Sequence, residues 1–261
     1  MQARLFQLDA FAACRFAGNP AAVMLFEQYP DDRILQALAS ENNLAETAFL
    51  VPDGGDFRIR WFTPAVEVPL CGHATLASAA VVLERLDRAR EQVVFHSASG
   101  PLAVRRSERG YAMDFPVRHC EPAEEPAGLA DALGRSIEEA LWDGFNFVVR
   151  LATAGDVRAL SPDLAFIARM PCAGVIVTAP GYGEHDCVSR YFAPDKGIPE
   201  DPVTGGAHCA LTPYWAARLG KSEIRAFQAS ARGGELRCRL QGDRVELEGS
   251  CVFYLEGIAQ W

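Results

Sequence analysis

The second half of this chain repeats the first half at long range. Residues 60–64 read RWFTP and residues 190–194 read RYFAP, and further matches follow in one register after a three-residue insertion. A period this long excludes a solenoid, whose repeats run about 20–50 residues. The repeat therefore predicts two similar domains. The matches after the insertion pair Glu67 with Glu200, Pro69 with Pro202, Gly72 with Gly205 and Ala74 with Ala207.

Each copy has an apolar segment that follows a glycine turn. Residues 73–86 are apolar nearly all round, which is typical of a helix buried on every side. The counterpart is about 206–219, where Pro213 should kink the helix or delay its start. The pattern predicts an α+β fold with two pseudo-symmetric domains, each a mostly antiparallel sheet curled around one apolar helix. The expected strands are 5–11, 21–25, 47–51, 57–62, 92–96, 101–105, 110–115, 224–228, 234–239 and 244–248.

The domain boundary is expected in a segment rich in proline and glutamate. Residues 116–136 contain three prolines and little apolar pattern, so they are the candidate linker. We expect an N-terminal domain of residues 1–118, joined by the C-terminal strand 250–261. The C-terminal domain would then be residues 119–249, the repeat of the first.

Composition limits the class of protein and its partners. Hydrophobic residues are 49% and charged residues 23%, so each half can bury a core. A net charge of −9 argues against a nucleic-acid partner. The chain has no apolar stretch of 18 residues and no apolar signal-peptide core, so we expect a cytoplasmic protein that does not engage a membrane. The eight cysteines are scattered, which indicates reduced thiols and predicts no metal site.

Glu46 is the first candidate for chemistry. It lies in the segment ENNLAETAFL, residues 41–50, between a turn and an expected strand. A carboxylate among apolar side chains has its pKa raised by desolvation, which suits a general acid and base near neutral pH. A capping or solvated turn glutamate is the alternative interpretation.

The first glycine turn adds three candidates. In EVPLCGHAT, residues 67–75, Gly72 permits the turn and His73 begins the helix. His73 could give a proton or a hydrogen bond to a ligand, or could only cap its own helix. Cys71 stands where a helix N-terminus lowers a thiol pKa, although the sequence favours a small packed residue at this position.

The second glycine turn is the repeat of the first. In GIPEDPVTGGAH, residues 197–208, Asp201 precedes Gly205 and Gly206. Asp201 could hold a polar substrate group or be an ordinary turn residue before proline. Helix N-termini carry free N–H groups and a positive dipole end, so we expect the two turns to face each other and bind a small anion. Neither turn matches a nucleotide P-loop.

At these residues the sequence resembles the phenazine-biosynthesis (PhzF-like) isomerase family, whose fold is that of diaminopimelate epimerase. The resemblance implies a cofactor-free isomerase, active between two pseudo-symmetric domains and assembled as a homodimer. It also implies that Glu46, His73 and Asp201 are the catalytic residues and that the anion-binding backbone is at Gly72, Gly205 and Gly206. The matching stretches are FAGNPAAV (16–23), ENNLAETAFL (41–50), RWFTPAVEVPLCGHATLASA (60–79) and SRYFAPDKGIPEDPVTGGAHCAL (189–211).

Three hypotheses on function remain open at this point. The first is an isomerase that moves a proton between carbons of a small carboxylate-bearing metabolite. The second is a binding protein of the same fold without catalysis, since function resides in sites and not in folds. The third is an epimerase that depends on Cys71. The repeat partner of Cys71 is Thr204, which is not a thiol, so racemisation by two thiols is disfavoured.

Overall fold

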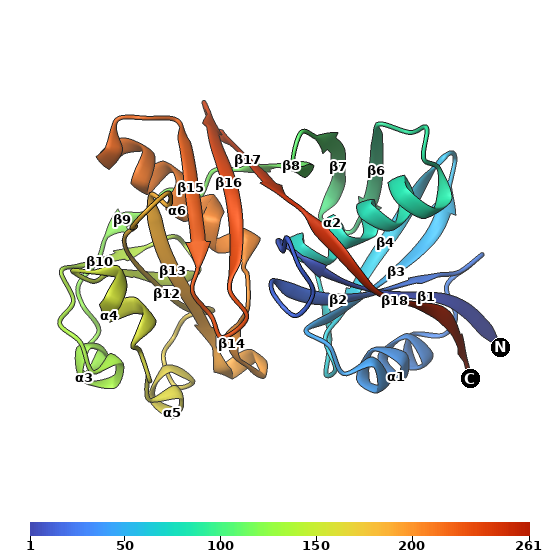
Figure 1. Cartoon of the computed structure of the whole chain (residues 1–261). Helices are drawn as coiled ribbons and strands as arrows, with labels where there is room; N and C mark the ends of the chain where they lie inside the picture. Colours follow the sequence, from blue (N-terminus) through green and yellow to red (C-terminus); the bar gives the residue numbers. More distant parts are fainter. The chain divides into compact units, whose positions relative to one another are not determined.

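The computed structural model describes residues 1–261, and the chain divides into two units. The N-terminal unit is Met1–Asp114 together with Glu248–Trp261, and the C-terminal unit is Phe115–Leu247. The last strand of the chain thus belongs to the unit that contains the first strand. Each unit is a curled sheet with helices, drawn in Figure 1.

The N-terminal unit surrounds one buried helix with strands. Helix α2 (Gly72–Val81) continues as a π-helical turn, η1 (Val82–Leu86). Helix α1 (Asp32–Asn42) is capped at its N-terminus by the side chain of Asp31. The predicted helix 73–86 is therefore present, with its last turn wider than an α-helix. The strands are β1 (Gln2–Ala10), β2 (Asn19–Leu25), β3 (Glu46–Asp53), β4 (Asp56–Phe62), β5 (Glu67–Val68), β6 (Gln92–Ser97), β7 (Gly100–Ser107), β8 (Gly110–Pro116) and β18 (Cys251–Gln260).

Helix α2 is the core of this unit. Every residue from His73 to Val81 is buried, and the helix contacts β1, β2 and β3. Small side chains fill most of these positions, so the strands can approach the helix on all sides. Helix α1 belongs to a separate apolar cluster, in which its residues Leu35 and Ala39 pack with Phe49 of β3.

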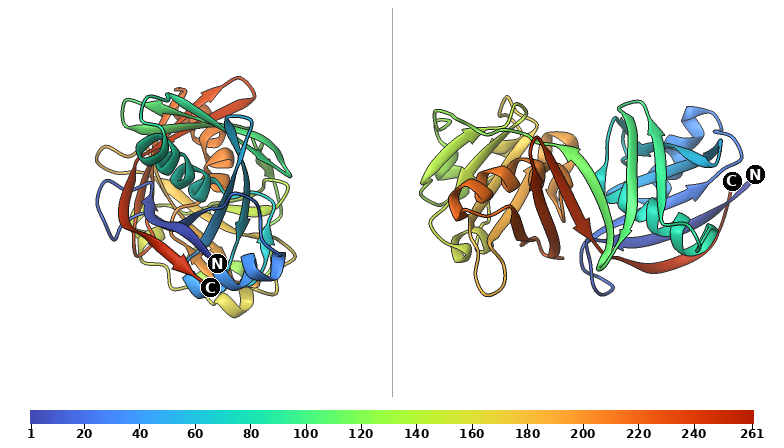
Figure 2. Two further views of the ribbon diagram at one scale, coloured as in Figure 1. Left: turned by 90° about the vertical axis from the view of Figure 1, so that its right-hand side faces the viewer. Right: turned by 90° about the horizontal axis from the view of Figure 1, so that it is seen from above.

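The two chain ends lie side by side within the N-terminal unit, as Figure 2 shows. Strand β1 pairs with β18 in antiparallel register along nearly its whole length, from Gln2 with Gln260 to Ala10 with Cys251. The Trp261 N–H also donates to the carbonyl of Met1 at 3.1 Å. The C-terminal strand therefore completes the first sheet.

The C-terminal unit has its own buried helix and sheet. Helix α6 (Gly205–Leu219) is buried over most of its length, and three short helices, α3 (Leu129–Leu133), α4 (Ala154–Arg158) and α5 (Leu164–Ile167), pack on an apolar cluster of the sheet. A 3₁₀ turn, η2, spans Pro194–Lys196. The strands are β9 (Glu121–Pro122), β10 (Glu139–Trp142), β11 (Asn146–Arg150), β12 (Gly174–Pro180), β13 (Cys187–Ala193), β14 (Ile198–Asp201), β15 (Glu223–Gln228), β16 (Gly234–Gln241) and β17 (Arg244–Gly249).

The strand pairing repeats between the units. Most pairs are antiparallel, but β2 pairs with β3 and β4 with β6 in parallel. In the C-terminal unit, β11 with β12 and β13 with β15 are parallel. The parallel pairs fall at equivalent places because α1 or α4 and α5 connect the first pair, and α2 or α6 connects the second. The internal repeat is thus a repeat of topology, and the α+β prediction is confirmed.

Pro213 lies inside α6 without delaying its start. Proline has no N–H, so the carbonyl of Cys209 loses its partner within the helix. The backbone N–H of Arg118 donates to that carbonyl at 3.1 Å. Cys120 extends the contact, with its Sγ 3.9 Å from the carbonyl of Ala210. The helix begins at Gly205 and runs through Pro213, so of the two expected effects of this proline the delayed start is wrong.

The expected linker is more ordered than the sequence indicates. Residues 116–136 include strand β9 and helix α3, and Leu129 and Leu133 are buried in the core of the C-terminal unit. The low apolar content of the segment concealed these two anchoring residues. The short strand β5, all strands from β9 to β14 and the helices α3, α4 and α5 were not predicted from the sequence.

Candidate active site

Glu46 is the first residue of β3 and is buried. Strand β3 lies parallel to β2, with Glu46 in register with Ala21, and residues 48–51 of β3 are apolar core. The turn Asn43–Ala45 separates α1 from β3, so the strand starts at the carboxylate. The sequence expectation of a carboxylate in apolar surroundings matches this placement.

His73 lies next to Glu46. Its Nε2 is 3.2 Å from Glu46 Oε2, and both side chains are almost fully buried. Burial lowers the pKa of His73 to about 3, against the opposing effect of the Pro20 carbonyl. The imidazole is therefore neutral at neutral pH, so its contact with Glu46 is not an ion pair between two charges.

Asn19 orients the His73 ring from the other side. The Asn19 Nδ2 is 3.1 Å from His73 Nδ1, and Asn19 is fully buried at the start of β2. The preceding turn needs Gly18, which has φ +65°, and a Cβ there would lie 2.2 Å from the Ala10 carbonyl oxygen. Glycine at this position thus allows the chain to place Asn19 on the ring.

Cys71 completes the group. It is the N-cap residue of α2, is buried, and has its Sγ 3.5 Å from His73 Nδ1. The Cys71 side chain makes no capping hydrogen bond to the helix, and its carbonyl accepts from Thr75 Oγ1 at 2.6 Å. The first amides of α2, which begins at Gly72, are thus left without a side-chain cap. This is the usual arrangement of an anion-binding helix N-terminus.

Asp201 is the last residue of β14 and is buried. Its Oδ2 accepts a hydrogen bond from Thr204 Oγ1 at 2.5 Å. Gln228, which is fully buried at the end of β15, donates from Nε2 to the Asp201 carbonyl at 2.7 Å and accepts from the Thr204 N–H at 2.8 Å. These bonds fix the turn that leads into α6.

Arg118 lies beside the N-terminus of α6. A Cβ added to Gly206 would be 3.6 Å from Arg118 Nη1, and the guanidinium stacks 4.9 Å from the ring centroid of Phe145. The α6 N-cap, Thr204, makes no side-chain capping bond. Two positive features thus meet at Gly206: the guanidinium and the helix N-terminus.

The nearest carboxylate to Arg118 does not neutralise it well. Asp143 Oδ2 is 4.0 Å from Arg118 Nη1, which is too long for a hydrogen bond. Asp143 is instead fully engaged by its own loop, where it accepts from the N–H groups of Phe145 and Asn146 and from Asn146 Nδ2. Arg118 is therefore available for an external anion.

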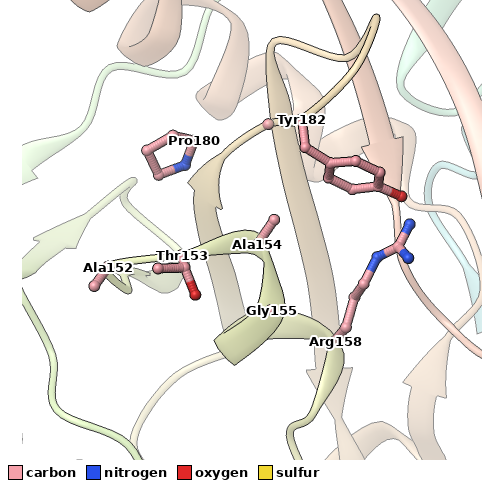
Figure 3. A pocket seen from close by; sticks show the side chains of 8 residues that line it. Ala152, Thr153, Ala154, Gly155, Arg158, Pro180 and Tyr182 are labelled. Atoms are coloured by element: carbon pink, nitrogen blue, oxygen red, sulfur yellow. The ribbon is translucent and has the colours of Figure 1, made fainter.

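A surface hollow of about 530 Å³ lies elsewhere in the C-terminal unit. Figure 3 shows its wall, where the guanidinium of Arg158 lies next to the ring of Tyr182, 4.4 Å from the ring centroid. None of the predicted site residues lines it, and its lining includes no carboxylate, thiol or imidazole. We therefore do not assign the chemistry to this hollow.

The structure brings together the predicted residues of each unit. Glu46, Cys71 and His73 have ligand-type atoms within 4.8 Å of one another. Asp201 and the Gly205-Gly206 turn form a second group in the C-terminal unit. That the two groups face each other stays a prediction.

The sequence reasoning missed Asn19, Gln228 and Arg118 as site residues. Asn19 carried a weak signal, because Asn-Pro after glycine marks a turn before a strand. Gln228 and Arg118 carried none, since their partners are 24 residues or more away along the chain.

Comparison with known proteins identifies the class and then the family. The model of the family described as phenazine biosynthesis-like protein matches residues 8–257. An uncharacterized isomerase of Pseudomonas aeruginosa is 49% identical over 257 residues, and the aligned region spans 98% of this chain and 98% of that protein. The chain is thus related to isomerases, and it belongs to the phenazine biosynthesis-like protein family.

Solved structures agree with this assignment. A PhzF-family protein of Enterococcus faecalis superposes with a TM-score of 0.96 at 41% identity, with both chains covered completely. A hydroxyproline epimerase from Agrobacterium vitis superposes with a TM-score of 0.64 at 12% identity, over 98% of this chain and 92% of the other, which shows a shared fold only. The predicted family, epimerase-like fold and isomerase class are confirmed. None of the helices combines the length and the apolar character that crossing a membrane requires.

Proposed function

We propose that the protein is a cofactor-independent isomerase that moves a proton between two carbons of a small metabolite bearing a carboxylate. The reaction would take place between the two units, with Glu46 as the acid–base group. The observation that carries the proposal is the buried contact of Glu46 Oε2 with His73 Nε2, 3.2 Å apart, near the N-terminus of α2. His73 is neutral there, so it lies beside the carboxyl group without adding a positive charge.

The proposed step needs only one proton. The Glu46 carboxylate removes a proton from one carbon and leaves the electron pair delocalised over the substrate. The resulting carboxylic acid returns the proton to a second carbon, so nothing is consumed. Amides at a helix N-terminus stabilise the negative charge that develops in between. Acid–base catalysis of this kind contributes about 10²–10⁴ in rate.

The anionic nature of the substrate is supported by both helices. Neither α2 nor α6 has a side chain that caps its first amides. Arg118 places a full positive charge beside Gly206. The N-terminus of α6 is also positive, so the guanidinium and the helix end repel each other when no anion is bound. This arrangement is favourable once a carboxylate is bound. We assign anion binding to Gly72, Gly205, Gly206 and Arg118, and a polar contact with the substrate to Asp201.

The test begins with a search for the substrate. Cyclic and acyclic amino and hydroxy acids are incubated with the enzyme in deuterium oxide, and incorporation of deuterium at carbon is followed by NMR. The Glu46→Gln variant keeps the shape of the side chain and removes its base. It should lose about 10²–10⁴ of the exchange rate. The control is Glu41→Gln, the same change on an exposed residue of α1, which should leave the rate unaltered.

Two results would reject the proposal in favour of the alternatives. Full exchange in Glu46→Gln would exclude Glu46 as the base. If Cys71→Ala and thiol alkylation then abolished exchange, the Cys71-dependent epimerase would be supported, for which the 3.5 Å contact of Cys71 with His73 is the relevant observation. Binding of a carboxylate ligand with no exchange in any acid of the screen would support the non-catalytic binding protein.

A further inference from the structure

Three side chains of different donor chemistry converge at the N-terminus of α2. They are the carboxylate of Glu46, the thiol of Cys71 and the imidazole of His73, and one ligand atom of each lies within 4.8 Å of the others. All three are buried and come from the N-terminal unit, so their convergence is independent of the other unit. The sequence analysis expected no metal site, because the cysteines are scattered along the chain.

The donor set is one that a borderline-soft divalent cation prefers. Zinc takes thiolate sulfur, imidazole nitrogen and carboxylate oxygen, and in catalytic sites commonly has three protein ligands and one open position. Tetrahedral bonds of about 2.0 Å to nitrogen and oxygen place these two ligand atoms roughly 3.3 Å apart. Glu46 Oε2 and His73 Nε2 are already 3.2 Å apart. The Cys71 Sγ lies 3.5 Å from Nδ1 of His73. The Cys71 side chain therefore has to rotate toward Nε2 of that ring to become the third ligand.

The surroundings orient two of the three ligands. The Asn19 Nδ2 lies 3.1 Å from His73 Nδ1, and the ring points Nε2 at Glu46. Nε2 binds an ion only when the ring proton is on Nδ1, so metal binding requires the Asn19 amide to turn and accept a hydrogen bond from Nδ1 through Oδ1. Thr75 Oγ1 donates to the Cys71 carbonyl and fixes the backbone that carries the thiol. Outer contacts of this kind raise metal affinity because they hold the ligands in place before the ion binds.

We propose that Glu46, Cys71 and His73 bind a zinc-type divalent cation, and that the bound ion inhibits the enzyme. Binding releases the thiol proton to water and forms the bond from sulfur to the metal. The ion occupies the carboxylate oxygen that would otherwise remove the substrate proton. The inhibition rests on the proposed function, whereas the binding does not.

The binding test uses the purified full chain after treatment with a chelator. Co²⁺ replaces Zn²⁺ as a spectroscopic probe, and calorimetry with Zn²⁺ gives the stoichiometry and affinity. We expect one ion per chain and a thiolate-to-cobalt charge-transfer band in the near ultraviolet. Cys71→Ser should lose the band and weaken Zn²⁺ binding by more than the roughly 10–100-fold that loss of an outer contact causes.

A matched control uses another thiol of the same unit. Cys14 is exposed and lies outside the cluster, so Cys14→Ser should keep the band and the affinity. A band that persists in Cys71→Ser and disappears in Cys14→Ser would overturn the proposal, as would wild-type protein with no charge-transfer band. Circular dichroism of each variant shows whether it is folded.

The inhibition test is separate. Once a substrate is found, Zn²⁺ should stop carbon–deuterium exchange in the wild type in proportion to its calorimetric occupancy, and a chelator should restore it. Full exchange at saturating Zn²⁺ would overturn the inhibitory role. If Glu46→Gln proves fully active, the proposed function fails while the cobalt spectrum still decides whether the metal binds.

Discussion

Arg190 holds Glu200 through two parallel hydrogen bonds, from Nε to Oε1 at 2.6 Å and from Nη2 to Oε2 at 2.9 Å. The repeat-equivalent Arg60 holds Glu67 in the same way, with both bonds at 2.7 Å. In each unit the pair joins the long strand before the glycine turn to the short strand that leads into that turn. The repeat has thus kept one ion pair that supports the same turn twice.

The two pairs differ in their surroundings, which predicts different effects on stability. Arg190 is more buried than Arg60 and also donates from Nη1 to the carbonyls of Val157 and Leu160. The Nη1 of Arg60 donates instead to the exposed carboxylate of Asp32, where water screens the interaction. Lysine replaces neither the parallel bonds nor these extra ones. We expect Arg190→Lys to lower the free energy of unfolding by about 1.5–3 kcal/mol and Arg60→Lys by less than about 1 kcal/mol. Urea titrations measure both values, and equal losses would contradict the explanation.

The apolar pattern of the sequence predicts both central helices because that information is local, and matching segments reveal the repeat. The contacts that complete the structure are not local. Helix α6 passes through Pro213 because the Arg118 N–H reaches the Cys209 carbonyl, 91 residues away in the chain. Which strands pair in parallel also cannot be predicted from alternation of apolar and polar residues, because that pattern does not reveal strand direction.

Some site residues are likewise indicated by their local sequence, whereas others reach the site only through the fold. Glu46, Cys71 and His73 stand in short segments whose apolar and glycine neighbours already indicate chemistry. Gln228 is an ordinary strand residue in sequence, and only the fold brings it to Asp201. Nothing in the sequence distinguishes Gln228 from the exposed Gln241.

Gln228 should stabilise the turn that carries Asp201. Leucine has a similar volume but removes the partners of the Thr204 N–H and the Asp201 carbonyl. A buried polar group without a partner costs about 1–3 kcal/mol. We expect Gln228→Leu to lose about 2–4 kcal/mol in thermal or urea unfolding and to lower kcat/KM as well. Gln241→Leu, on the exposed end of β16, is the control and should change neither.

Arg118 should determine the affinity for the anionic part of the substrate. Hydrogen bonds to charged groups contribute about 1.5–3 kcal/mol, so Arg118→Gln should raise KM roughly 10–100-fold with a smaller effect on kcat. Arg169→Gln makes the same change of net charge at an exposed position and should leave KM unchanged. Steady-state kinetics measure both constants. An equal rise of KM in the two variants would show that only net charge matters.

His208 predicts how stability depends on pH. The residue is buried in the first turns of α6, and its Nδ1 donates to the Thr204 carbonyl at 2.8 Å, so Nδ1 carries the proton of the neutral ring. Burial lowers the pKa of His208 to about 4, against the opposing effect of that carbonyl. In the unfolded chain the pKa is near 6.5. Between these two values the unfolded state binds the extra proton and the folded state does not.

The sign of the effect follows from this difference. The contribution of the neutral ring is fully present above about pH 6.5 and is lost as the pH falls toward 4, by roughly 3 kcal/mol in total. His73 adds a loss of its own that also begins near pH 6.5 and continues to about pH 3, in the wild type and the variants alike. His208→Gln should therefore be less stable than the wild type at pH 7, and the gap should narrow steadily between pH 6.5 and 4. His119→Gln, at an exposed position, should track the wild type throughout. Urea unfolding of the three proteins across this range measures the gap, and a gap of constant size would mean that His208 titrates alike in the folded and unfolded chains.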